Sequence, residues 1–171
     1  RLNPGAQPLV ILQPGGPVMF VFDVSDTTPE PDAPELPPAV EHPFSVLSGT
    51  IGDELGRTIE NARRDGVETV DGRAGSQQAA CISTVGGGRS LAFAAPGRPQ
   101  PKTVWVPLRY RIVLNDAVPP ESQYASLAHE LAHLYCGHLG TPNENWWPDR
   151  HRLDVRTCEF VAESVAYLVC A

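Results

Sequence analysis

The chain has 171 residues, 42% of them hydrophobic and 19% charged, which is enough for one folded domain and argues against global disorder. Its formal net charge of −7 argues against a free-standing nucleic-acid binder, because such proteins usually carry a basic surface. The sequence has no signal peptide and no apolar run long enough to cross a membrane, so we expect a cytoplasmic protein with reduced cysteines and no membrane partner.

The first 43 residues contain short apolar runs followed by a segment rich in proline and acid. The runs at residues 8–13 and 17–24 are separated by Pro-Gly-Gly, which predicts a β-hairpin. Residues 26–43 carry repeated prolines, which remove backbone donors, so we expect an extended linker there and no folded element. We therefore divide the chain into residues 1–43, with the N-terminal strands and the linker, and residues 44–171, the main domain.

The middle of the chain predicts one helix and several strands. Apolar residues recur at helical spacing between residues 51 and 64. Strands are predicted at residues 79–85, 90–94 and 110–114, with a Gly-Gly-Gly turn after the first of them. Together with two helices near the C-terminus, these elements predict an α+β fold, in which a small, mostly antiparallel sheet packs on helices.

Two prolines open the next predicted helix, which runs from about residue 119 to Cys136. Proline is tolerated in the first turn because the donors of that turn have no intrahelical partner. Gly137 is a suitable stop for this helix. After a loop that contains two tryptophans, Asp154 is a candidate cap for a last helix, which runs to the end of the chain.

Residues 129–133 of the first of these helices read His-Glu-Leu-Ala-His, an HExxH pattern. Residues four apart lie on one helix face, so both imidazoles can bind one zinc ion at about 2.0 to 2.1 Å. Glu130 lies beside them and could take a proton from a water molecule on the metal. The opposite face carries Leu127, Leu131 and Leu134, which predicts that this side packs into the core. The alternative is an ordinary pair of core or surface histidines, which so short a pattern also allows.

A catalytic zinc ion usually has three protein ligands and one open position. The last predicted helix offers Glu159 and Glu163, which are four residues apart and therefore share a face. The small residues Ala162 and Ala166 fit close packing of this helix against a metal site. Because apolar residues alternate with both acids, we expect the carboxylates to be buried; the alternative is that both are solvated. From the helix face alone, either carboxylate could be the third ligand of a site between the two helices.

From residue 110 onward, the chain resembles the ImmA/IrrE family of metallopeptidases. The similarity rests on the strand at residues 111–115, the HExxH helix at residues 124–133, and Glu-Phe-Val-Ala-Glu from residue 159, which resembles the family's Glu-x-x-Ala-Asn helix. The resemblance implies that Glu159 is the third zinc ligand. Glu163 stands where the family often has Asn and where thermolysin-like enzymes have an acid that orients a ligand histidine. Its implied role is to hold such a histidine by its free ring N–H.

Four residues of the loop after the HExxH helix have two interpretations each. His138 and His151 are candidates for contacts with the substrate or the transition state, or they are simply exposed. Trp146 and Trp147 either line a substrate groove or anchor the loop to the core.

The sequence therefore predicts a zinc-dependent endopeptidase with Glu130 as general base and then acid. The resemblance implies that it cuts a specific protein, often a DNA-bound repressor, in a stress or mobile-element response. One alternative is a binding module that keeps the zinc but no longer cuts. Another is a single-stranded-DNA-binding protein of the ArdC anti-restriction type, since residues 72–115 hold six basic groups and no acidic ones, and residues 23–28 resemble the lead-in of such proteins.

Overall fold

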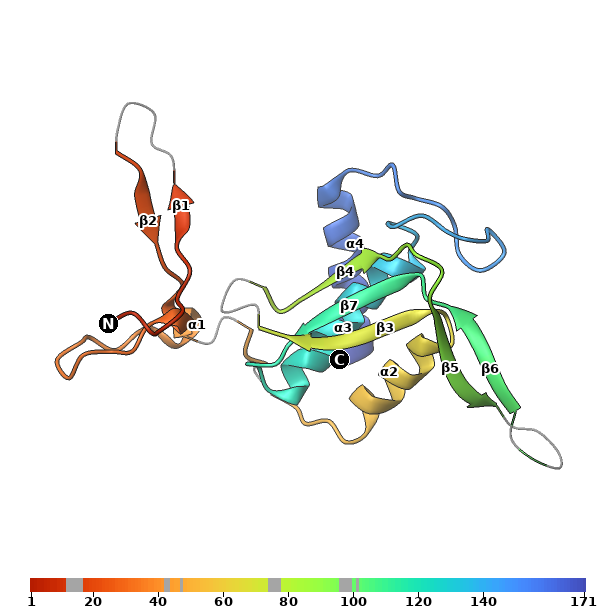
Figure 1. Ribbon diagram of the computed structural model, residues 1–171, viewed down its shortest axis with the longest axis horizontal. Coiled ribbons are helices and arrows are strands. Elements are labelled where there is room, and N and C mark those ends of the chain that lie inside the picture. The colour runs from red at the N-terminus through yellow and green to blue at the C-terminus, as the bar shows by residue number, and fades with distance from the viewer. Residues whose placement is uncertain (12–16, 42–43, 47, 74–77, 96–99, 101) are drawn as a thin grey trace.

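The computed structural model describes residues 1–171 apart from residues 12–16, 42–43, 47, 74–77, 96–99 and 101 (Figure 1). In chain order the elements are β1 (Leu9–Ile11), β2 (Met19–Val21), the 3-10 helix η1 (Val24–Asp26), α1 (Pro38–Glu41), α2 (Glu54–Arg63), β3 (Val67–Gly72), β4 (Ala80–Thr84), β5 (Ser90–Ala95), β6 (Lys102–Pro107), β7 (Tyr110–Asn115), α3 (Pro120–Tyr135) and α4 (Val155–Cys170). The fold is α+β, with small sheets and helices, as the sequence predicts.

The central sheet has three strands in the order β3-β7-β4 and packs against α2 and α3. β4 runs antiparallel to β7 and pairs Ile82 with Ile112, whereas β3 runs parallel to β7 and pairs Thr69 with the same residue. A parallel pair needs a crossover, which the chain makes through β4, β5 and β6. The hairpins β1–β2 and β5–β6 are antiparallel, so the expectation of mostly antiparallel pairing is confirmed.

One face of β7 packs on α3 and forms the core. Tyr110, Ile112 and Leu114 alternate along the strand and are all buried, because successive strand residues point to opposite faces. α2 packs beside β3, and its buried residue Ala62 belongs to the core. The predicted apolar face of α3 is confirmed, since all three of its leucines are buried. The buried members of this core are Ala62, Val67, Ala80, Tyr110, Ile112, Leu114, Leu127, Leu131, Leu134 and Trp147.

Asn115 fixes the turn that leads from β7 into α3. The residue is buried, and its amide donates to the carbonyl oxygen of Gln78 at 3.0 Å. Its Oδ1 accepts from the backbone N–H of Ala117 at 3.0 Å, and its own carbonyl accepts from the Gln123 amide at 3.1 Å. α3 then begins with Pro120 in its first turn, as predicted. These bonds tie the start of the HExxH helix to the sheet.

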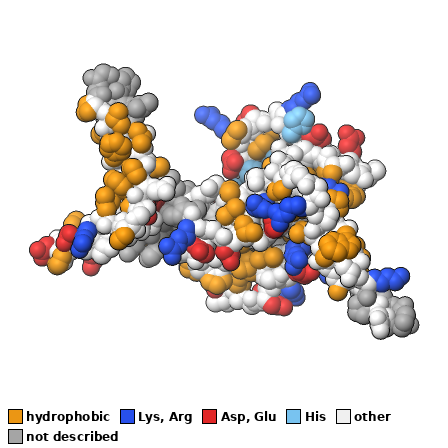
Figure 2. Space-filling view, in the orientation of Figure 1, with side chains coloured by type: hydrophobic (Ala, Val, Ile, Leu, Met, Phe, Trp, Pro, Cys, Tyr) orange, Lys and Arg blue, Asp and Glu red, His pale blue; other side chains and the backbone are white. Residues whose placement is uncertain are grey.

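The N-terminal strands pair with each other as predicted, although the predicted turn at residues 14–16 lies outside the described residues. The hairpin stands apart from the central sheet (Figures 1 and 2), and its side chains at Leu9, Val10, Met19, Phe20 and Val21 are exposed. The expectation that residues 26–43 hold no folded element is wrong at α1, a single helical turn at Pro38–Glu41. Proline fits the first position of a helix, so a proline-rich segment can still start one.

Two strands that were not predicted, β3 and β6, complete the β structure. β6 pairs with β5 in a hairpin that projects away from the helices (Figure 1). No helix in the described part of the chain has the length and hydropathy that a membrane span requires.

Candidate metal centre

α3 and α4 bring three metal-binding side chains together. His129 and His133 lie one turn apart on α3, and Glu159 lies at the beginning of α4. Asp154 caps α4, since its carboxylate accepts the backbone N–H of Thr157 at 3.1 Å, as the sequence predicts. The cap fixes where the first turn of α4 starts and therefore where Glu159 is placed.

Small side chains let the two helices approach closely. Ala128 and Ala132 on α3 are buried, and so are Ala162 and Ala166 on α4. The two helices pack along each other in this region, as the small residues of α4 predict. The close approach allows the short carboxylate side chain of Glu159 to reach the histidines.

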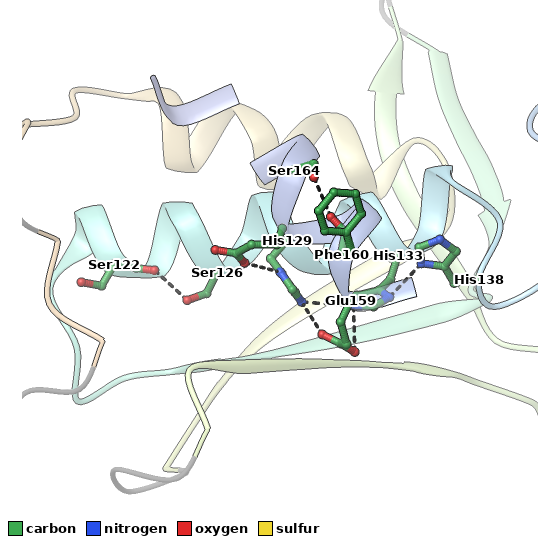
Figure 3. Close-up of polar contacts among 9 residues, drawn as sticks. Ser122, Ser126, His129, His133, His138, Glu159, Phe160 and Ser164 are labelled. Atoms are coloured by element: carbon green, nitrogen blue, oxygen red, sulfur yellow. Dashed lines mark hydrogen bonds and ion pairs between the residues drawn. The ribbon is translucent and has the colours of Figure 1, made fainter. Parts of the chain in front are cut away.

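The three side chains converge on one point (Figure 3). The Nε2 atoms of His129 and His133 are 3.1 Å apart, and Glu159 Oε2 and Oε1 lie 3.4 Å and 3.5 Å from them, respectively. Ligand atoms held tetrahedrally at about 2.0 to 2.1 Å from one ion are about 3.3 Å apart. The donor set, two imidazole nitrogens and a carboxylate oxygen, therefore fits a single metal ion.

The outer ring nitrogens of both histidines also have partners. His129 Nδ1 lies 3.2 Å from Glu163 Oε2, and His133 Nδ1 lies 2.9 Å from His138 Nδ1. When Nε2 binds a metal, Nδ1 carries the proton and donates it to such a partner. Both contacts are therefore compatible with the tautomer that leaves Nε2 free for a metal.

The expectation that both carboxylates are buried is wrong. The side chain of Glu159 is 56% exposed and that of Glu163 is 78% exposed. The alternating apolar residues do not require the acids to be buried, because α4 also has an exposed apolar face, with Phe160, Tyr167 and Leu168. The metal-binding cluster therefore opens to solvent on the α4 side.

Glu130, the residue after His129 on α3, lies next to the edge strand β4. Burial raises the pKa of its carboxyl, while His129 and a hydrogen bond from the Ile82 backbone oppose the shift. Burial likewise lowers the pKa of His133, which favours the neutral ring that a metal requires. The structure thus places a carboxyl group of raised pKa near His133, whose lowered pKa favours a neutral ring.

A hollow of about 540 Å³ opens over the cluster and contains both loop histidines that were singled out from the sequence. His138 and His151 line it together with the metal-binding residues, so their contact with a substrate stays a prediction. His151 Nδ1 is 2.6 Å from Asp149 Oδ1. Neither tryptophan lines it: Trp147 is buried and donates to the Gly140 carbonyl at 3.0 Å, and Trp146 stacks under Arg109. The tryptophans thus anchor the loop.

Sequence reasoning missed the residues that β4 and the start of α4 contribute to this hollow. Gln78, Ala80 and Ile82 form its wall opposite α4, and Leu153 and Val155 form its far end. No local pattern marks them, because they are ordinary polar or apolar residues whose position depends on long-range strand pairing.

The comparisons with known proteins agree with this geometry. Residues 92–170 match the family model described as the IrrE N-terminal-like domain, and this range contains α3, α4 and all three members of the cluster. No curated protein and no solved structure matches the chain. Proteins with this domain are metallopeptidases, which act on protein substrates. Residues 92–170 of this chain are therefore similar to the ImmA/IrrE family of metallopeptidases.

Proposed function

We propose that this chain is a zinc-dependent endopeptidase that cuts a specific protein. The observation that carries the proposal is the convergence of His129 Nε2, His133 Nε2 and the Glu159 carboxylate within 4.8 Å of one another. Two imidazoles and one carboxylate, with a further position open to solvent, are the ligand set of catalytic zinc in peptidases. The family supports a protein substrate, and a DNA-bound repressor is the candidate that the resemblance implies.

A zinc ion held by His129, His133 and Glu159 would supply a nucleophilic water at neutral pH and would polarise the scissile carbonyl. Glu130 takes the proton of the attacking water and then passes it to the amine that leaves. The raised pKa of Glu130 suits both steps, because a stronger base accepts the proton more readily and can still return it. Glu163 and His138 hold the rings of His129 and His133 in position.

The free edge of β4 offers a path for the peptide across the site. The backbone N–H of Asn115 donates to Ala79, so the odd-numbered residues of β4 pair with β7. Ala80, Ile82 and Thr84 therefore direct their N–H and C=O groups toward the free edge, where Ala80 and Ile82 line the hollow. A substrate segment added to this edge as a strand would bring its backbone past Glu130 and the metal.

The DNA-binding alternative has less support from the described residues. Arg89 and Arg111 both bind the Glu68 carboxylate, at 3.3 Å and 2.7 Å, and Arg109 stacks on Trp146. Three of the six basic groups in residues 72–115 are thus engaged within the protein.

A comparison of two glutamates on α3 tests the proposal. We expect about one zinc per chain by elemental analysis, and cleavage of a mixed peptide library, with the new termini identified by mass spectrometry. Glu130→Gln should keep the zinc and lose the cleavage, whereas Glu121→Gln, in the first turn of the same helix, should keep both. Cleavage by Glu130→Gln at the wild-type rate would contradict the proposed role of Glu130, and a zinc-free wild-type protein would contradict the metal centre.

A further inference from the structure

A second hollow of about 540 Å³ adjoins the one over the metal-binding cluster. Both hollows are lined by Gln78, Ala80, His129 and Glu130, so they meet at the proposed general base. The second hollow extends along α3 toward its N-terminus, where Ser126 and Ser122 lie one and two turns before His129 (Figure 3). A peptide that crosses the metal would therefore enter both hollows, one on each side of the bond to be cut.

The walls of the second hollow are small and largely uncharged. Ala125 and Ser126 of α3 and Ala166 of α4 all line it, and their short side chains leave room beside the packed helices. Glu130 and Glu163 lie at the end nearest the cluster. Away from that end, no charged side chain among the described residues lines the hollow, so nothing there would pair with a charged substrate group.

Larger apolar side chains form the rim of the second hollow. Tyr167 of α4 contributes one side, and Phe44 and Val46, which follow the proline-rich segment, contribute the other. These two residues lie outside the range 92–170 that matches the family model. The rim therefore combines a part shared with the family and a part contributed by this chain's own N-terminal region.

We propose that this second hollow is a specificity pocket, which accepts a large apolar side chain, aliphatic or aromatic, next to the scissile bond of the substrate. The inference rests on the proposed peptidase function and adds the class of residue that is selected. The apolar members of the lining, Phe44, Val46, Ala125, Ala166 and Tyr167, favour an apolar side chain through burial of its surface. The small residues at the bottom set the size limit, and Tyr167, Phe44 and Val46 set the shape at the entrance.

The test measures binding, so it does not depend on turnover. Calorimetry with the zinc-loaded protein compares the hydroxamates of glycine, leucine and phenylalanine, whose hydroxamate group binds the metal while the side chain occupies a neighbouring pocket. We expect the leucine and phenylalanine compounds to bind about 10-fold more tightly than the glycine compound, because they bury additional apolar surface. Ala125→Leu, which fills the hollow, should abolish this gain and leave binding of the glycine compound unchanged.

Two exposed aromatic residues of α4 provide a matched pair that should not disturb folding. Tyr167 and Phe160 are 72% and 74% exposed, but only Tyr167 lines the hollow. Tyr167→Ala should reduce the advantage of the phenylalanine compound, and Phe160→Ala should not. The inference is overturned if the preference for apolar side chains is absent, or if it survives both Ala125→Leu and Tyr167→Ala. Failure of the proposed peptidase function would give other results than these: the wild-type protein would lack zinc, or cleavage would not depend on Glu130.

Discussion

His133 Nδ1 lies 2.9 Å from His138 Nδ1, on the side of the ring opposite the metal-binding cluster. One of these two nitrogens must donate and the other must accept. Burial lowers the pKa of His138, which favours the neutral ring that can accept a proton from His133. We infer that His138 orients His133 for metal binding, in addition to lining the hollow above it.

His138→Ala should therefore weaken zinc affinity about 10- to 100-fold, which is the usual effect of removing the partner of a ligand histidine. The measurement is a competition titration with a chromophoric chelator. His151→Ala is the matched control, because His151 lines the same hollow but binds Asp149 instead of a metal-binding residue. Equal affinities for the His138→Ala and wild-type proteins would show that His133 needs no such partner.

The HExxH helix and its core face could be predicted because both depend on local spacing. Leu127, Leu131 and Leu134 are buried, and His129 and His133 share the opposite side, as a helical period requires. The cap at Asp154 was predictable for the same reason, since it involves only residues three apart. The division of the chain at residue 43 stays a prediction.

The edge position of β4 could not be predicted, because it depends on pairing between distant segments. β7 lies between β3 and β4, and its parallel partner β3 begins more than forty residues earlier in the chain. Exposure of Glu159 was also beyond the sequence pattern. The apolar residues of α4 suggest burial all round, yet Phe160 and Leu168 are exposed in the structure.

An ion pair between Glu68 and Arg111 joins strands β3 and β7. Its contribution to the free energy of unfolding should depend on pH. Arg111 donates to Glu68 Oε2 from Nε at 2.9 Å and from Nη2 at 2.7 Å, and this hydrogen bonding lowers the pKa of Glu68 from 4.5. As pH falls, Glu68 is protonated in the unfolded chain before it is protonated in the folded protein. The stabilisation from the ion pair is therefore complete above the unfolded pKa of 4.5, and it is lost as pH falls through the lowered pKa of the folded protein.

Glu68→Gln should reduce the free energy of unfolding by about 0.5 to 1 kcal/mol at neutral pH, since the pair is partly exposed. The difference from wild type should vanish at acidic pH, where the wild-type carboxyl is also protonated. Urea unfolding of the metal-free protein over a pH series measures both effects. Glu60→Gln, which removes an exposed pair with Arg63, is the control and should have less effect. A difference that is independent of pH would exclude the ion pair as its source.

Two glycines with the same backbone conformation should respond differently to substitution. Gly137 and Gly140 have φ of 82° and 81°, a region that costs other residues about 1 to 2 kcal/mol. A methyl group at Gly140 would meet no atom closer than 3.8 Å, whereas at Gly137 it would overlap the carbonyl oxygen of Pro148. Gly140→Ala should show the conformational cost alone, and Gly137→Ala should be clearly more destabilising in urea unfolding. Equal losses would mean that the loop moves freely away from the end of α3.

The two glutamates of α4 should differ in their effect on zinc affinity. Glu159 faces the Nε2 atoms of both histidines, whereas Glu163 reaches only the outer nitrogen of His129, at 3.2 Å from Nδ1. Glu159→Ala removes a ligand and should lose most of the zinc affinity. Glu163→Ala should weaken it only about 10- to 100-fold. Glu163→Gln should recover part of that loss, because its amide oxygen can still accept the ring N–H.

A chelator competition titration of these three variants decides between the two assignments. Each side chain is exposed, so the substitutions should leave the fold intact, which circular dichroism can check. If Glu163→Ala is more damaging than Glu159→Ala, the roles of the two carboxylates are reversed. In that case His129 would have to turn its ring so that Nδ1 faces the metal, and its contact with His133 Nε2 at 3.1 Å would be lost. The expected order, with Glu159→Ala the more damaging, follows from the present ring orientation without any such movement.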